Sequence, residues 1–102
     1  MKFSKNLYLS NSIRHLSRIK WRLRTGRGQL NIYLLTISNS SDQLDCFHNA
    51  LLKQRFFRQQ PLMVVGIAAD YSEAIMLIEQ ITQEVYDKTG CADIKKYLLQ
   101  YF

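Results

Sequence analysis

The sequence predicts a small α/β domain in which strands alternate with helices. Two segments, residues 32–37 and 62–69, are apolar on both faces, as strands covered on both sides are. Amphipathic patterns of helical length precede, separate and follow them. Strands that alternate with such helices form right-handed crossovers and a parallel sheet. We therefore expect the order βαβαβαα, with a three-stranded, mainly parallel sheet in a two-layer or three-layer domain.

Length and composition predict one domain over residues 1–102, because 47% apolar residues suffice for one core without disulfides. Cys46 and Cys91 form no Cys-x-x-Cys motif and no secretory leader precedes them, so we interpret both as reduced thiols in the cytoplasm. The longest apolar run, Leu62–Ala69, is far shorter than the ~20 residues of a membrane helix. We expect a soluble protein.

The N-terminal part predicts a strand followed by a helix. Leucines alternate with other residues over Lys5–Leu9, which indicates a strand. The side chains of Ser10–Ser12 are expected to cap the helix that follows. Its apolar side is formed by Ile13, Leu16, Ile19 and Leu23. The glycines of Thr25–Gly28 are expected to end it.

The middle of the chain predicts a strand and a second helix. Leu30–Ile37 is rich in β-branched and aromatic residues. Residues Ser40–Gln43 have the spacing of a capping box, so a helix is expected over about Ser41–Phe57. Pro61 stops any helix before it.

The C-terminal part holds the clearest patterns. Leu62–Ala69 predicts a buried strand, in which Gly66 indicates close packing against a helix. Asp70–Glu73 is a capping box that starts a helix to Lys88, with Gly90 as a left-handed terminator. Ala92–Phe102 is expected to be helical, and an edge strand is its alternative.

This arrangement also predicts a partner. If the three strands follow one another in the sheet, all crossover helices cover one face and leave the other bare. The C-terminal segment or a second copy would then cover it, so we expect a homodimer.

The net charge of +6 is unevenly distributed. Residues 1–30 carry eight basic residues and no acid, whereas residues 61–102 carry six acids and three basic residues. Arginines that recur every four residues beside a tryptophan suit a phosphate backbone with exposed bases. The nucleic-acid-binding hypothesis names Arg14, Arg18, Lys20, Trp21, Arg22, Arg24 and Arg27. A solvated helix face, or pairing with the acidic third helix, is the favoured interpretation.

A second hypothesis concerns the carboxyl edge of the sheet, where open α/β folds bind ligands. The first helix begins with cations and no acid, unlike the two later helices, so its N-terminus suits phosphate, sulfate or a carboxylate. The anion or ligand site would comprise Ser10, Asn11, Ser12, Arg14, His15, Ser40 and Ser41. The competing interpretation is that these side chains only cap helices.

Catalytic patterns are weak. Cys46 and His48 would point about 160° apart on a helix, so they are not a nucleophile–base pair, and His48 is expected to be a buried or boundary residue. The histidines and cysteines have no metal-ligand spacing, and Gly26 and Gly28 end a helix instead of following a strand. We expect no cofactor and no metal.

The resulting functional prediction is a small cytoplasmic binding or interaction module without evident catalytic machinery. One alternative is a binding protein or an enzyme that binds phosphate or another small ligand at the carboxyl edge of the sheet. The other alternative is a weak nucleic-acid binder that uses the basic N-terminal helix.

Overall fold

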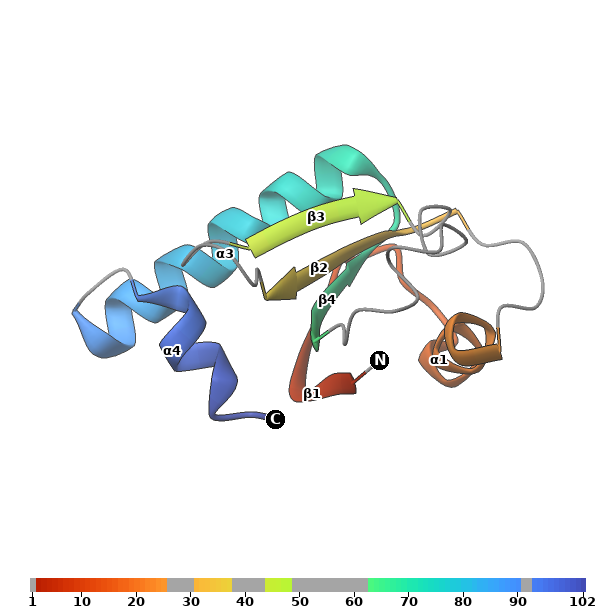
Figure 1. Ribbon diagram of the computed structural model, residues 1–102. Helices are drawn as coiled ribbons and strands as arrows, with labels where there is room; N and C mark the ends of the chain where they lie inside the picture. Colours follow the sequence, from red (N-terminus) through yellow and green to blue (C-terminus); the bar gives the residue numbers. More distant parts are fainter. Residues whose placement is uncertain (1, 26–30, 38–43, 49–62, 91–92) are drawn as a thin grey trace.

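The fold was analysed in a computed structural model, which describes residues 2–25, 31–37, 44–48, 63–90 and 93–102, without the side chains of residues 24 and 25. Figure 1 shows a mixed sheet with helices around it. Its elements are β1 (Lys2–Leu9), α1 (Leu16–Thr25), β2 (Tyr33–Ile37), β3 (Leu44–His48), β4 (Met63–Ala68), α3 (Tyr71–Thr89) and α4 (Ile94–Leu99).

The sheet has four strands in the order β1-β4-β2-β3. β1 runs parallel to β4, whereas β2 is antiparallel to both β4 and β3. The predicted α/β class is confirmed, but the three-stranded, mainly parallel sheet is wrong. The difference arises because β3 lies where the helix over Ser41–Phe57 was predicted, and it pairs with β2 in the antiparallel direction.

The two faces of β3 explain why a strand forms there. Phe47 packs into the cluster of buried side chains beneath α1, whereas Leu44 and Cys46 pack against the cluster beneath α3. Successive side chains of a strand point to opposite faces, so this segment contributes to both clusters. A helix would direct all its apolar residues to one side. The other residues of the predicted second helix lie outside the described part of the chain.

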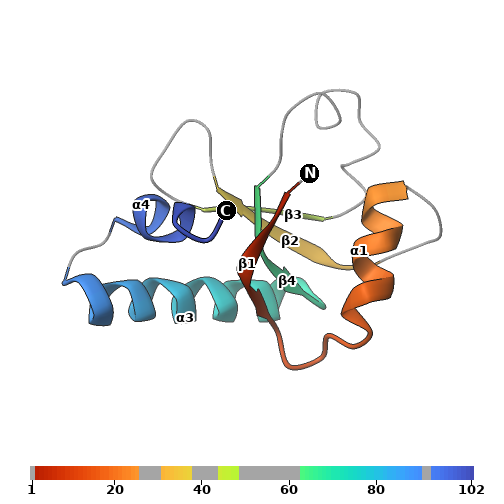
Figure 2. The ribbon, with the colours of Figure 1, turned by 90° about the horizontal axis from the view of Figure 1, so that it is seen from below.

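Helices cover both faces of the sheet. Ile19 and Leu23 of α1 pack on the face that bears Val64 and Ile67 of β4. The helices α3 and α4 pack on the opposite face, against Val65 and Ala68 of the same strand. Figure 2 shows α3 and α1 on different sides of the strands. The predicted bare face is therefore wrong, and with it the structural reason for expecting a homodimer; the homodimer itself stays a prediction.

The long helix α3 forms as its sequence predicts. The Asp70 carboxylate accepts a hydrogen bond of 2.8 Å from the Glu73 amide, which satisfies one of the free amides at the start of the helix. Gly90 adopts the left-handed conformation at φ 73°, and its amide donates to the Tyr86 carbonyl at 2.8 Å. The helix buries Ala74, Leu77, Ile81 and Val85.

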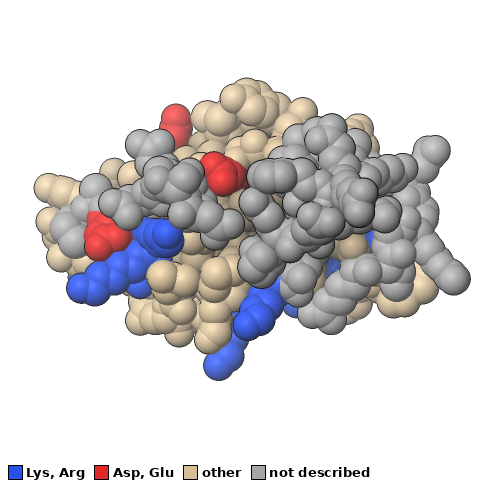
Figure 3. Space-filling view, in the orientation of Figure 1, with Lys and Arg blue, Asp and Glu red and all other residues tan. Residues whose placement is uncertain are grey.

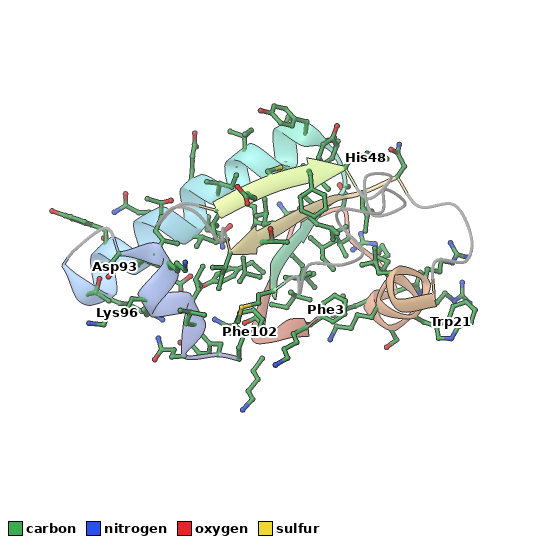
Figure 4. The ribbon with its side chains drawn as sticks, in the orientation of Figure 1. Phe3, Trp21, His48, Asp93, Lys96 and Phe102 are labelled. Carbon is green, nitrogen blue, oxygen red and sulfur yellow. The ribbon has the colours of Figure 1, made fainter. Side chains whose placement is uncertain are left out.

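The C-terminal segment is a short helix, so the favoured prediction is confirmed over the edge strand. α4 buries Ile94 and Leu98 against the α3 side of the core. The Tyr101 carbonyl accepts a hydrogen bond of 2.8 Å from the Lys5 amide, which attaches the end of the chain to β1. Phe102 accordingly lies beside β1 in Figure 4.

Gly66 marks close packing, as predicted. The register between β2 and β4 shifts between the partners of Leu35 and Thr36, which pair with Gly66 and Val64. A Cβ atom on Gly66 would lie 3.0 Å from Leu35 Cδ1 and 3.2 Å from Leu77 Cδ2. The absent side chain therefore lets α3 pack closely on the irregular part of the strand.

The first helix is shorter and less firmly anchored. It begins at Leu16, later than predicted, and the His15 carbonyl accepts from the Arg18 and Ile19 amides at 3.0 and 3.2 Å. His15 itself has a positive φ of 54°. The predicted strands Lys5–Leu9, Leu30–Ile37 and Leu62–Ala69 are confirmed, with bounds that differ by one to three residues. No helix in the described part of the chain is long and apolar enough to cross a membrane.

Candidate functional site

The turns after β1 and β4 meet at one edge of the sheet. Because these strands are parallel, both end there, and the Ser10 hydroxyl accepts a hydrogen bond of 3.1 Å from the Ala69 amide. Close by, the Ser12 amide donates to Glu73 Oε1 at 3.3 Å. β2 runs the other way and ends at the opposite edge, at Ile37. Ser40 and Ser41 lie outside the described residues.

The structure gives the predicted anion-site residues a structural role. Ser10 to Ile13 form a turn in which the Ile13 amide donates to the Ser10 carbonyl at 3.1 Å, so the serines do not cap α1. The Glu73 carboxylate already accepts from the Ser12 amide. Asn11, Arg14 and His15 are exposed. An anion at this amide would approach a carboxylate, so the local charge disfavours it, although the anion site itself stays an untested prediction.

A group of aromatic and polar side chains lies at the same edge, on the α3 side. The His48 imidazole and the Asn31 amide oxygen are 2.6 Å apart, measured from Nε2 to Oδ1. The Tyr33 ring meets the His48 ring edge-on at 5.2 Å between centroids, and it meets the Tyr71 ring at 5.7 Å. Figure 4 shows His48 at the end of β3. We call Asn31, Tyr33, His48 and Tyr71 the edge cluster.

Sequence reasoning missed the edge cluster because it placed His48 on a helix. The antiparallel register aligns Tyr33 with both His48 and Ala68, which brings three distant segments together. One signal for a strand is present in residues 44–48. With the alternation of a strand, Leu44 and Cys46 point to one face and Phe47 to the other. Such a short run fits a strand and a helix equally well.

Cys46 and His48 also relate differently from the prediction. On strand β3 they point to the same face, so the predicted 160° separation on a helix is wrong. Burial raises the pKa of the Cys46 thiol, which favours the protonated form over the nucleophilic thiolate. Since Nε2 of His48 is engaged with Asn31, the described geometry provides no activated cysteine.

The second candidate is the exposed side of the first helix. Arg14, Arg18 and Trp21 are exposed, and Trp21 retains 55% of its accessible surface. Figure 4 shows Trp21 pointing away from the sheet, on the outer side of α1. Lys20 lies over the Phe3 ring, with Nζ 5.2 Å from the ring centroid. We call the basic side chains of α1 and of the residues just before it, together with Trp21, the α1 surface: Arg14, Arg18, Lys20, Trp21 and Arg22.

The α1 surface is basic, and its cations form no ion pair with the residues that the structure describes. Within the described part of the chain the ion pair is Lys88 with Glu84, at 3.1 Å on α3, and no cation of the α1 surface takes part in one. Arg24 and Arg27 from the nucleic-acid hypothesis are not described at the level of side chains. The structure therefore brings together five of the seven residues that this hypothesis names, on one helix and the residues just before it.

The helix on the opposite face of the sheet has the opposite charge. From Asp70 to Thr89 there are five carboxylates against a single lysine. Glu79 and Asp87 are exposed there, together with Tyr71, Met76 and Tyr86. On the face shown in Figure 3, red carboxylates lie apart from basic side chains in the upper part, whereas at the left side red and blue side chains lie next to each other. We call Tyr71, Ile75, Met76, Glu79, Tyr86 and Asp87 the α3 surface.

The described residues include no group of three His, Cys, Asp or Glu side chains that could hold a metal ion. Comparisons with protein-family models, curated proteins and solved structures found no match to this chain. The fold and these surfaces therefore define only a class: a small domain with a mixed α/β sheet and oppositely charged helices on its two faces.

Proposed function

We propose that this protein is an interaction module that binds an acidic partner on the α1 surface. The observation that carries the proposal is the concentration of Arg14, Arg18, Lys20 and Arg22, none of which forms an ion pair among the described residues, on the same short segment as a tryptophan that is 55% exposed. Tryptophan and arginine are enriched at the energetic centres of interfaces.

The energetics of the helix support a binding role. Arg18 and Arg22 are four residues apart on α1, and like charges at this spacing destabilise a helix by about 0.2–0.5 kcal/mol. α3 shows the stabilising alternative, since Glu84 and Lys88 have the same spacing and opposite charges. No ion pair among the described residues offsets the repulsion on α1, and an acidic partner would relieve it.

The cellular location follows the same proposal. Cys46 is a free, half-buried thiol, which suits a reducing compartment. We therefore place the interaction in the cytoplasm.

The proposal is tested with heparin as a polyanionic probe and with the fluorescence of Trp21, the single tryptophan of the chain. We expect heparin to change the Trp21 emission, and the effect to weaken as NaCl screens the charges. The double variant Arg18→Glu/Arg22→Glu should lose most of the affinity.

The matched control is Lys95→Glu/Lys96→Glu on α4, which changes the net charge by the same amount. Figure 4 shows Lys96 far from Trp21. We expect this control to retain most of the affinity. Equal losses in the two double variants would show that only net charge matters, and would refute the α1 surface as a binding site.

A further inference from the structure

The two charged surfaces of this chain are complementary to each other. The α1 surface presents arginines around Trp21, and the α3 surface presents Glu79 and Asp87 among exposed apolar side chains. Met76 is 66% exposed and Tyr86 is 57% exposed. Aromatic side chains pack favourably on methionine sulfur, and arginine pairs with carboxylates. The α3 surface therefore offers both kinds of group that the α1 surface would bind.

These surfaces cannot meet within one molecule. α1 and α3 pack on opposite faces of the sheet, with alternate residues of β4 pointing to each. A contact between them therefore requires two copies of the chain.

The charges also select how two copies would meet. A symmetric pair that joins α3 to α3 would bring two acidic helices together, and one that joins α1 to α1 would bring two basic surfaces together. Like-charge contacts oppose association, whereas α1 against α3 is attractive. A contact between different surfaces of identical subunits is heterologous, and it produces rings or open chains instead of closed dimers.

We infer that the acidic partner of the α1 surface is the α3 surface of a second copy, so that the protein associates head to tail. This inference rests on the proposed function, because it names the partner of the same surface. In place of the homodimer expected from the sequence, it gives an assembly that can add further copies at both ends.

The test measures the weight-average mass by sedimentation velocity over a concentration series up to about 200 μM, at about 50 and 500 mM NaCl, where the screening length falls by roughly threefold. We expect the mass of the wild-type protein to rise with concentration beyond that of a dimer at low salt, and to return to that of a monomer at high salt. A mass that remains monomeric at low salt, or that stops at a dimer, would overturn the inference.

Two charge-reversal variants test which surfaces meet. Arg18→Glu/Arg22→Glu lowers the formal charge of the α1 surface from +4 to zero, so it no longer attracts the acidic α3 surface, and Glu79→Lys/Asp87→Lys makes both surfaces basic. Each variant alone should be monomeric at low salt, whereas an equimolar mixture should associate, because the acidic α3 surface of the first variant fits the basic α1 surface of the second. A mixture that stays monomeric would contradict the head-to-tail contact. Circular dichroism verifies that both variants are folded.

The same variants separate the inference from the proposed function. If the wild-type protein is monomeric but heparin binding still depends on Arg18 and Arg22, the second copy is excluded and the binding surface stands. A single-stranded oligonucleotide that changes the Trp21 emission of such a monomer would identify nucleic acid as the partner instead. If Arg18→Glu/Arg22→Glu alters neither heparin binding nor the mass, both proposals fail.

Discussion

The helices on the two faces of the sheet differ in how they are used. α3 extends over 19 residues, is capped by Asp70 and Gly90, and buries four side chains of which three are completely inaccessible. α1 extends over 10 residues and follows a residue with positive φ, His15. Its buried residues, Ile19 and Leu23, each retain 8% exposure. The core depends on α3 more than on α1.

The weaker anchoring of α1 in the core explains how this small domain tolerates an unfavourable charge pattern on that helix. The repulsion between Arg18 and Arg22 amounts to a few tenths of a kcal/mol, a small part of the ~5–15 kcal/mol that stabilises a typical domain. Such a cost is tolerated where a helix contributes little to the core. The acidic residues of α3, in contrast, include partners within the chain: Glu84 for Lys88, and Glu73 for the Ser12 amide.

The largest expected effect tests the unequal contributions of the two layers. Replacing Ile81, which is completely buried on α3, with alanine should reduce the free energy of unfolding by about 4 kcal/mol, because the fixed surroundings leave a cavity. The matched change Ile19→Ala on α1 should cost only about 2 kcal/mol, since this site at the rim can collapse. Urea unfolding measures both values. If the two substitutions reduce the free energy of unfolding equally, α1 and α3 contribute equally to stability, and the difference between these helices is wrong.

If Ile81→Ala does not fold, Ile81→Val gives the same information on a smaller scale. It should cost about 1 kcal/mol, and Ile19→Val should cost less. The larger loss in the free energy of unfolding should belong to Ile81→Val.

A second, intermediate effect concerns how tightly α3 meets the sheet. In Gly66→Ala the new methyl group would meet Leu35 Cδ1 at 3.0 Å and Leu77 Cδ2 at 3.2 Å, so both leucines must move. We expect a loss of about 1–3 kcal/mol from overpacking. Gly66→Ala combined with Leu77→Val should recover part of this loss. An unchanged unfolding midpoint for Gly66→Ala would show that α3 is as loosely packed as α1.

The elements that were predictable from the sequence are those whose signals are local. The Asp70 carboxylate satisfies the free Glu73 amide of its own helix, and the Gly90 amide satisfies a carbonyl of the same helix, so these positions mark α3 wherever the sheet lies. The continuous apolar run of β4 and the close packing at Gly66 follow equally directly from their residue types.

The elements that were not predictable depend on distant pairing. β3 was taken for a helix because residues 40–43 resemble a capping box and because Leu44 and Phe47 also fit a helical spacing. Only its pairing with β2 decides between strand and helix, and that pairing also reverses the direction of the sheet. Tertiary contacts override local propensity in such short segments.

The two candidate sites also differ in whether the sequence alone predicts them. The charges of the α1 surface are contiguous in sequence, so their clustering was predictable. The edge cluster joins Asn31, His48 and Tyr71 from three separate segments, and its existence depends on the register of β2.

The smallest expected effect concerns the charge at the start of α3, which has no counterpart in the first turn of α1. Hydrogen bonds from the Glu73 amide, and then from the Ser72 hydroxyl, lower the pKa of Asp70 below its ordinary value of 3.8. The folded protein therefore binds this proton less readily than the unfolded chain, so the ionised carboxylate stabilises the fold above about pH 3.8 and loses this effect as the pH falls. Asp70→Asn retains a capping oxygen without the charge. We expect the wild-type protein to have the higher urea midpoint at pH 6, and the difference between the two midpoints to shrink steadily as the pH falls below 3.8 and the carboxyl becomes protonated. If the urea midpoints of the wild-type protein and Asp70→Asn still differ at low pH, the charge of Asp70 is not the cause. The starts of α1 and α3 would then not differ electrostatically.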